Sequence, residues 1–154
     1  MKSLFTILAS VLGLTCATVA GADGTNSPDP RQLIALDAHG RAELLSEMRG
    51  HLVNVQALLE GLAKADLKRA ANAARASGLA SASEAADDVV RQLPKDFTAL
   101  GMRLHQDFDR IADAANQGRD ARQLLLQLAD TMQKCVACHA LYKLRDDIRA
   151  VPKT

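Results

Sequence analysis

The chain has 154 residues and a formal net charge of +1, with 48% hydrophobic, 24% charged and only 3% aromatic residues. The sequence contains neither a basic stripe nor a block of like charge, which argues against a nucleic-acid-binding protein and against attachment to a membrane surface. The residues that follow the expected signal peptide are enough to form one domain with its own hydrophobic core.

The chain begins with the pattern of a secretory signal peptide, which we place at residues 1–22. Lys2 precedes a short apolar run that ends near Cys16, and alanines two residues apart close the segment at Ala22. This run is too short to span a bilayer, so we expect export to the periplasm without stable membrane insertion. Lipidation of Cys16 is the less favoured alternative, because Thr15 is a poor residue to precede a lipidated cysteine.

Residues 23–36 are expected to form an N-terminal loop or a short helix. From Asp37 onward, apolar residues recur at steps of three and four, which predicts an amphipathic first helix with one apolar seam. The seam consists of Leu45, Met48, Leu52, Val55, Leu59 and Leu62. A second, alanine-rich helix is predicted over residues 66–76, before Ser77 and Gly78.

Two further helices are predicted in the second half of the chain. The third covers residues 97–116, and the last runs from Asp120, a plausible N-cap, to Asp147. The stripe of the last helix consists of Leu125, Leu128, Met132, Cys135, His139 and Tyr142. Residues 79–94 fit either a short helix or an ordered connection. Because strand-like alternation is absent from the sequence and the connections are short, residues 37–150 are predicted to be all-α, as an antiparallel four-helix bundle.

The last predicted helix carries the run Cys135-Val136-Ala137-Cys138-His139. Two thiols at this spacing can add to the two vinyl groups of a haem while the adjacent imidazole ligates the iron. An export signal agrees with this chemistry, because such attachment takes place outside the cytoplasm. The sequence therefore predicts one covalently bound haem c per chain, with Cys135 and Cys138 as thioethers and His139 as an axial ligand of the iron.

Three other interpretations of the two cysteines are less favoured. A zinc site would need four ligands, and the candidates His51 and His105 lie on other helices at no fixed spacing. A thioredoxin-like redox pair follows a strand at the start of a helix, whereas this pair lies well inside a helical pattern. A disulfide between residues three apart on one helix would be strained.

A haem motif in the last helix of an exported four-helix bundle resembles the class II c-type cytochromes, which include cytochrome c prime and its low-spin relatives. The resemblance is most specific in residues 135–143. In this run two residues separate His139 from the aromatic Tyr142, and the basic Lys143 follows. The family usually has arginine at the last position, and Lys143 cannot supply the planar guanidinium of that residue. The resemblance implies that Tyr142 contacts the haem, and it leaves monomer and homodimer both open.

In this family the sixth iron position is either filled by a methionine of the first helix or left vacant for a small gas molecule. With the last helix taken to end near residue 148, Met48 lies close to the height of His139 and near the centre of the apolar face, which favours Met48 as the sixth ligand. A match of Arg41 to the family's arginine without gaps instead places Leu45 opposite a vacant position. Arg41 is also a candidate to pair with a haem propionate.

The sequence as a whole predicts a periplasmic mono-haem cytochrome that carries single electrons between redox partner proteins. We do not expect an enzyme, because the motif is not accompanied by a catalytic acid, base or nucleophile constellation. The alternative is a five-coordinate haem protein of the cytochrome c prime type that binds nitric oxide or carbon monoxide. A thiol or zinc protein without haem is the third hypothesis.

Overall fold

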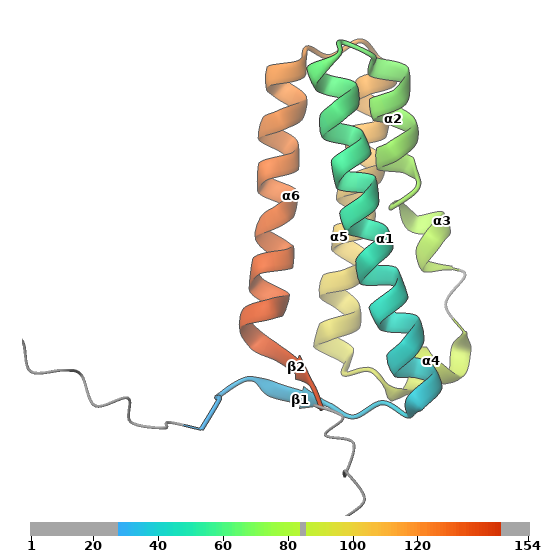
Figure 1. Cartoon of the computed structure of the whole chain (residues 1–154), viewed down its shortest axis with the longest axis vertical. Coiled ribbons are helices and arrows are strands. Elements are labelled where there is room, and N and C mark those ends of the chain that lie inside the picture. The colour runs from blue at the N-terminus through green and yellow to red at the C-terminus, as the bar shows by residue number, and fades with distance from the viewer. Residues whose placement is uncertain (1–27, 84–85, 146–154) are drawn as a thin grey trace, which may run out of the picture.

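The computed structural model describes residues 28–83 and 86–145, and these residues are mostly helical. The helices are α1 (Ala38–Ala63), α2 (Leu67–Arg75), α3 (Leu79–Ala82), α4 (Asp87–Gln92), α5 (Lys95–Asn116) and α6 (Ala121–Leu141), and the strands are β1 (Gln32–Ile34) and β2 (Tyr142–Leu144). Helices α1, α2, α5 and α6 lie side by side along the long axis of the molecule (Figure 1). The all-α prediction is confirmed. The predicted signal peptide 1–22 and the last part of the predicted domain, 146–150, lie outside the described residues.

Three of the helices begin at an aspartate that caps them. The side chains of Asp37, Asp66 and Asp120 each accept a hydrogen bond from the backbone N–H three residues further on, at 2.7 to 2.9 Å. Such a bond satisfies one of the free N–H groups of the first helical turn, which stabilises the helix start. The predicted starts of the first, second and last helices are therefore confirmed.

The core is densest where α2 packs between α1 and α5. Four alanines of α2 are buried, and a Cβ atom added at Gly61 of α1 would lie only 2.7 Å from the backbone nitrogen of Ala70. Small residues on both helices thus allow their backbones to approach closely. The larger side chains of this core come from α1, α5 and α6 and include Leu58, Leu62, Phe108, Ile111, Leu124 and Leu128.

The apolar seam predicted for the first helix is only partly buried. Leu52 is 71% exposed and Leu59 is 43% exposed, whereas Leu44 and Leu58, which lie outside that seam, are buried. At 100° per residue, the buried leucines of α1, which are Leu44, Leu58 and Leu62, are centred about 60° from the predicted seam. The reason is the position of the neighbours: close contacts join α2 to α1 and to α5, and α5 to α6, while α1 and α6 make few such contacts within the described chain.

The last helix is shorter than predicted, because it ends at Leu141 and not near Asp147. Tyr142 adopts an extended conformation and begins β2, which pairs in parallel with β1. The strand β1 lies within residues 23–36, where a loop or a short helix was expected. Strands of three residues are too short to show an alternating pattern, and their pairing joins distant parts of the chain.

Residues 79–94, for which the sequence left two possibilities, contain the short helices α3 and α4 on either side of residues 84–85, which are not described. α5 then begins at Lys95, directly after Pro94 and two residues earlier than predicted. In the part of the chain that the structure describes, no helix combines the length and apolar character needed to cross a membrane.

Candidate functional site on helix α6

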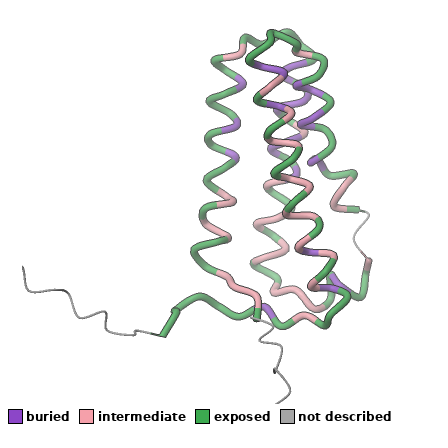
Figure 2. Tube along the Cα trace, viewed as in Figure 1, coloured by how far each residue is buried: buried purple, intermediate pink, exposed green. Residues whose placement is uncertain are grey.

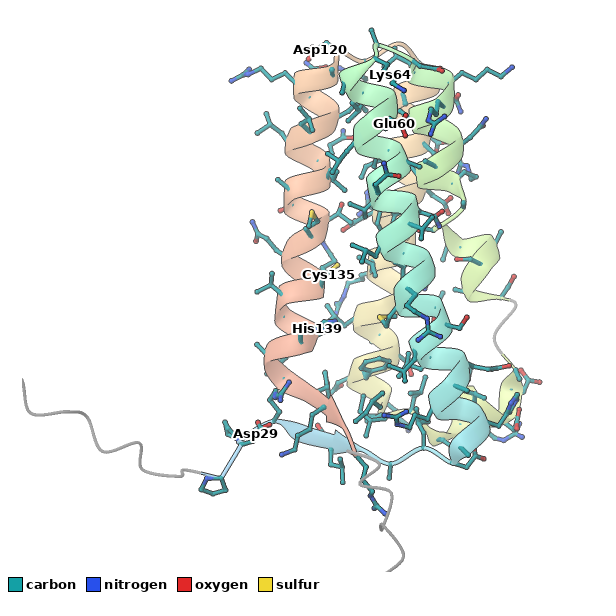
Figure 3. All side chains as sticks on the ribbon, in the orientation of Figure 1. Asp29, Glu60, Lys64, Asp120, Cys135 and His139 are labelled. Carbon is teal, nitrogen blue, oxygen red and sulfur yellow. The ribbon has the colours of Figure 1, made fainter. Side chains whose placement is uncertain are left out.

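The three residues of the predicted attachment motif occupy one side of α6. Cys135, Cys138 and His139 are spaced i, i+3 and i+4 within a continuous helix, and residues at this spacing are neighbours on a helix surface. Both cysteines are half-buried free thiols, and His139 is exposed. In Figure 3, Cys135 and His139 lie on the half of α6 that is remote from Asp120, and His139 lies towards Asp29.

The environment of the two thiols keeps them protonated. Burial raises the pKa of Cys135, and burial together with the proximity of Cys135 raises the pKa of Cys138. The pair also lies towards the C-terminal end of α6, where the helix dipole disfavours a thiolate. A thiol oxidoreductase needs the opposite, a cysteine with a lowered pKa at a helix N-terminus. The site therefore gives little support to the thioredoxin-like alternative.

The histidines considered as partners in a zinc site lie elsewhere. Within the described residues, His51 and His105 gather with Glu47, and their ligand atoms lie within 4.8 Å of one another. Neither cysteine of α6 belongs to this group. A site with two cysteines and two histidines is thus not assembled by this fold.

An ion pair between α5 and α6 holds the helix in place just before the motif. Lys134, which precedes Cys135, pairs with Asp107 of α5, and Arg110 pairs with the same carboxylate. The side chain of Asp107 is only 6% exposed, so this charge is shielded from water by the packed helices. Sequence reasoning missed this contact, since it joins residues on two different helices.

The helices around the motif are less tightly packed than those at the other end. Among the described residues, the segments 45–57 of α1, 95–104 of α5 and 132–141 of α6 contain no buried residue. Figure 2 shows buried residues concentrated at the end that α2 occupies, and mostly half-buried or exposed residues along the helices near β1 and β2. Large apolar side chains with substantial exposure in these segments are Leu52, Val53, Met102, Met132, Val136 and Leu141.

Because α6 ends earlier than predicted, the residue of α1 that lies level with His139 also differs from the predicted one. The C-terminal end of α1 and the N-terminal end of α6 lie at the same end of the molecule (Figure 1). Counted from these ends, His139 lies as far below Ala121 as Leu45 lies below Ala63, because every helical residue adds the same rise. Met48 lies three residues, less than one turn, above that level. Both Leu45 and Met48 are half-buried.

Arg41 and Tyr142 lie at the same end as the motif. Arg41 and Arg145 both line a cavity of about 250 Å³. The other lining residues are Ile34, Ala35, Leu36 and Leu144. Tyr142 packs edge-to-face against Phe97 of α5, with ring centroids 5.3 Å apart. Arg145 was not predicted from the sequence, because it enters the site through the pairing of β1 with β2.

Comparisons of the chain with protein-family models, with curated proteins and with solved structures found no match in any of the three.

Proposed function

We propose that this protein is an exported c-type cytochrome that carries single electrons on one haem attached to Cys135 and Cys138, with His139 as an axial ligand. The observation that carries this proposal is the placement of two free thiols and an imidazole on one side of α6. A covalent haem requires these groups at this spacing. When bound, the haem supplies an iron atom that exchanges one electron reversibly between its ferrous and ferric states.

The surroundings of the motif fit a large, planar, apolar group. The segments 45–57 of α1 and 95–104 of α5 have half-buried or exposed apolar side chains, as does the segment of α6 that carries the cysteines, and the contacts between α1 and α6 are few. A group held by Cys135 and Cys138 would gain contacts with these side chains and would be shielded from water by them. Arg41 and Arg145 would offer charge-assisted hydrogen bonds to its carboxylates.

We further propose that α1, α2, α5 and α6 form an antiparallel four-helix bundle of the kind found in class II c-type cytochromes. The order of close contacts supports this arrangement, because α2 contacts α1 and α5, and α5 contacts α6. In such a bundle the fourth side, between α1 and α6, would receive the cofactor. The expected export to the periplasm and the transfer of electrons between redox partner proteins, without enzymatic activity, belong to the same proposal.

Met48 is the sixth ligand in this proposal. Its thioether would raise the reduction potential of the iron, as methionine ligation does in electron-carrying cytochromes. A specific observation favours the second candidate, a five-coordinate haem protein that binds nitric oxide or carbon monoxide: the residue level with His139 is Leu45, which cannot ligate iron. The two candidates differ in spin state and in their response to carbon monoxide.

The test is an absorption spectrum of the protein produced in a host that attaches haem to exported chains. A low-spin spectrum with a methionine-to-iron band is expected, and a high-spin spectrum that shifts with carbon monoxide would replace the electron carrier by the gas-binding protein. The double variant Cys135→Ser/Cys138→Ser should lose the covalent haem, which is measured as absorbance that survives acid acetone extraction. A colourless wild-type protein from the same host would refute both haem functions.

A further inference from the structure

A second group of potential ligand side chains lies on the side of α1 that faces α5, apart from the cysteines. It consists of Glu47 and His51 on α1 and His105 on α5. We propose that these three residues bind a divalent transition-metal ion, for which zinc is the best-fitting candidate. The site uses no residue of the predicted haem attachment, so it is independent of the function proposed above.

The separations between the ligand atoms are close to those of a metal site. Glu47 Oε1 lies 3.3 Å from His105 Nε2 and 3.6 Å from His51 Nε2. Tetrahedral zinc with bonds of about 2.0 to 2.2 Å to nitrogen and oxygen requires ligand atoms roughly 3.3 to 3.5 Å apart. All three ligand atoms lie within 4.8 Å of one another, so small side-chain movements suffice to close the site around an ion.

Both imidazole rings are oriented by hydrogen bonds on their other nitrogen. His105 Nδ1 lies 2.9 Å from the carbonyl oxygen of Ser77, an acceptor, so Nδ1 carries a hydrogen and donates it. His51 Nδ1 lies within hydrogen-bond distance of the Ser77 hydroxyl oxygen, at 3.0 Å, and this oxygen accepts a hydrogen bond from Asn54 Nδ2, at 2.9 Å. Such contacts are the usual outer partners of metal-bound histidines, because they fix the ring and leave Nε2 for the metal.

Burial and charge at the cluster also fit a metal ion. The side chains of His51 and His105 are only 12% and 7% exposed, and His51 Nε2 is buried with no hydrogen-bond partner among the described residues. The third ligand, Glu47, has a carboxylate side chain that faces both imidazole Nε2 atoms. A carboxylate oxygen beside two imidazole nitrogens is a donor set that zinc accepts.

Three protein ligands leave one position of a tetrahedral ion for a water molecule. In this arrangement the metal ties the middle of α1 to α5. Ser77, which is fully buried, extends the connection to the residues between α2 and α3. We therefore infer a mainly structural role, in which the ion adds a cross-link between α1 and α5.

The experiment is a titration with zinc ions of the full exported protein that carries its haem, and calorimetry measures the binding. We expect one zinc ion per chain, and about tenfold or greater loss of affinity in Glu47→Gln and in His51→Gln. The chain offers a matched control, since His39 and Glu43 form an exposed pair at the same i, i+4 spacing on the same helix, with 3.4 Å between His39 Nε2 and Glu43 Oε1. His39→Gln should bind zinc like the wild type.

X-ray absorption at the zinc edge of the wild-type complex provides a readout that does not depend on whether the variants fold. Scatterers at about 2.0 to 2.2 Å, without sulfur at about 2.3 Å, are expected for one carboxylate and two imidazoles. Sulfur in this shell would place the zinc outside the Glu47, His51 and His105 cluster and overturn the proposal. Absence of zinc binding, or an equal loss of affinity in His39→Gln, would overturn it as well. If the ligand variants do not fold, Ser77→Ala should still weaken binding by about tenfold.

Discussion

Lys134 of α6 forms an ion pair with Asp107 of α5, and the carboxylate of Asp107 is almost completely buried between the helices. Because Lys134 is the residue before Cys135, this pair fixes the position of the helical turn that carries the motif. Charges buried in this way are sensitive to the loss of a partner, since the remaining charge has no access to water.

Replacement of Lys134 by methionine should therefore destabilise the fold. We expect a loss of about 2–3 kcal/mol in the free energy of unfolding, somewhat below the value for a fully orphaned buried charge, because Arg110 still pairs with Asp107. Urea denaturation measures this loss. The exposed Lys68 provides the control, and Lys68→Met should change stability by less than about 0.5 kcal/mol. Equal stability of the two variants would show that the ion pair does not hold α6 in place.

Two glycines of α1 should respond in opposite directions to alanine. At Gly61, the added Cβ would lie 2.7 Å from the backbone nitrogen of Ala70, and we expect a loss of about 1–3 kcal/mol as α2 is pushed away. At Gly50, no atom lies within 4 Å of the added Cβ, so Gly50→Ala should stabilise the helix by about 0.5–1 kcal/mol. Thermal unfolding of the two variants measures both changes. A stable Gly61→Ala variant would contradict the close approach of α1 and α2.

The identity of the sixth iron ligand can be tested by one substitution and its control. In the haem-loaded protein, Met48→Ala should convert a low-spin spectrum into a high-spin one, because alanine cannot ligate iron. Met102 is an exposed methionine of α5, and Met102→Ala should leave the spectrum unchanged. If Met48→Ala has no effect and Leu45→Trp abolishes carbon monoxide binding, Leu45 faces a vacant position.

Asp37 should make the stability of α1 depend on pH in the acid range. The hydrogen bond from the backbone N–H of Gly40 lowers the pKa of Asp37 below its ordinary value of 3.8. A carboxylate whose pKa is lower in the folded state stabilises that state above pH 3.8, and this contribution is lost as the pH falls through the lowered pKa. Asp37→Asn keeps a capping side chain but cannot ionise. The difference in unfolding free energy between wild type and variant should shrink as the pH falls below 3.8, and a constant difference would contradict this assignment.

The starts of the helices and the position of the motif were predictable because they depend on residues close together in the sequence. Asp37, Asp66 and Asp120 each cap a helix through a bond to a residue three positions on, and the spacing of Cys135, Cys138 and His139 places them on one side of any helix that contains them. The helical periodicity itself, with apolar residues at steps of three and four, also arises locally.

Only the tertiary structure decided which side of each helix is buried and where α6 ends. Leu58 rather than Leu59 enters the core because α2 packs beside that face of α1, and α6 stops at Leu141 because Tyr142 pairs with Gln32 of β1. The meeting of Glu47 and His51 with His105 likewise depends on how α1 packs against α5. These contacts join residues far apart in the sequence, so their energy comes from the packing of whole helices, which no local pattern records.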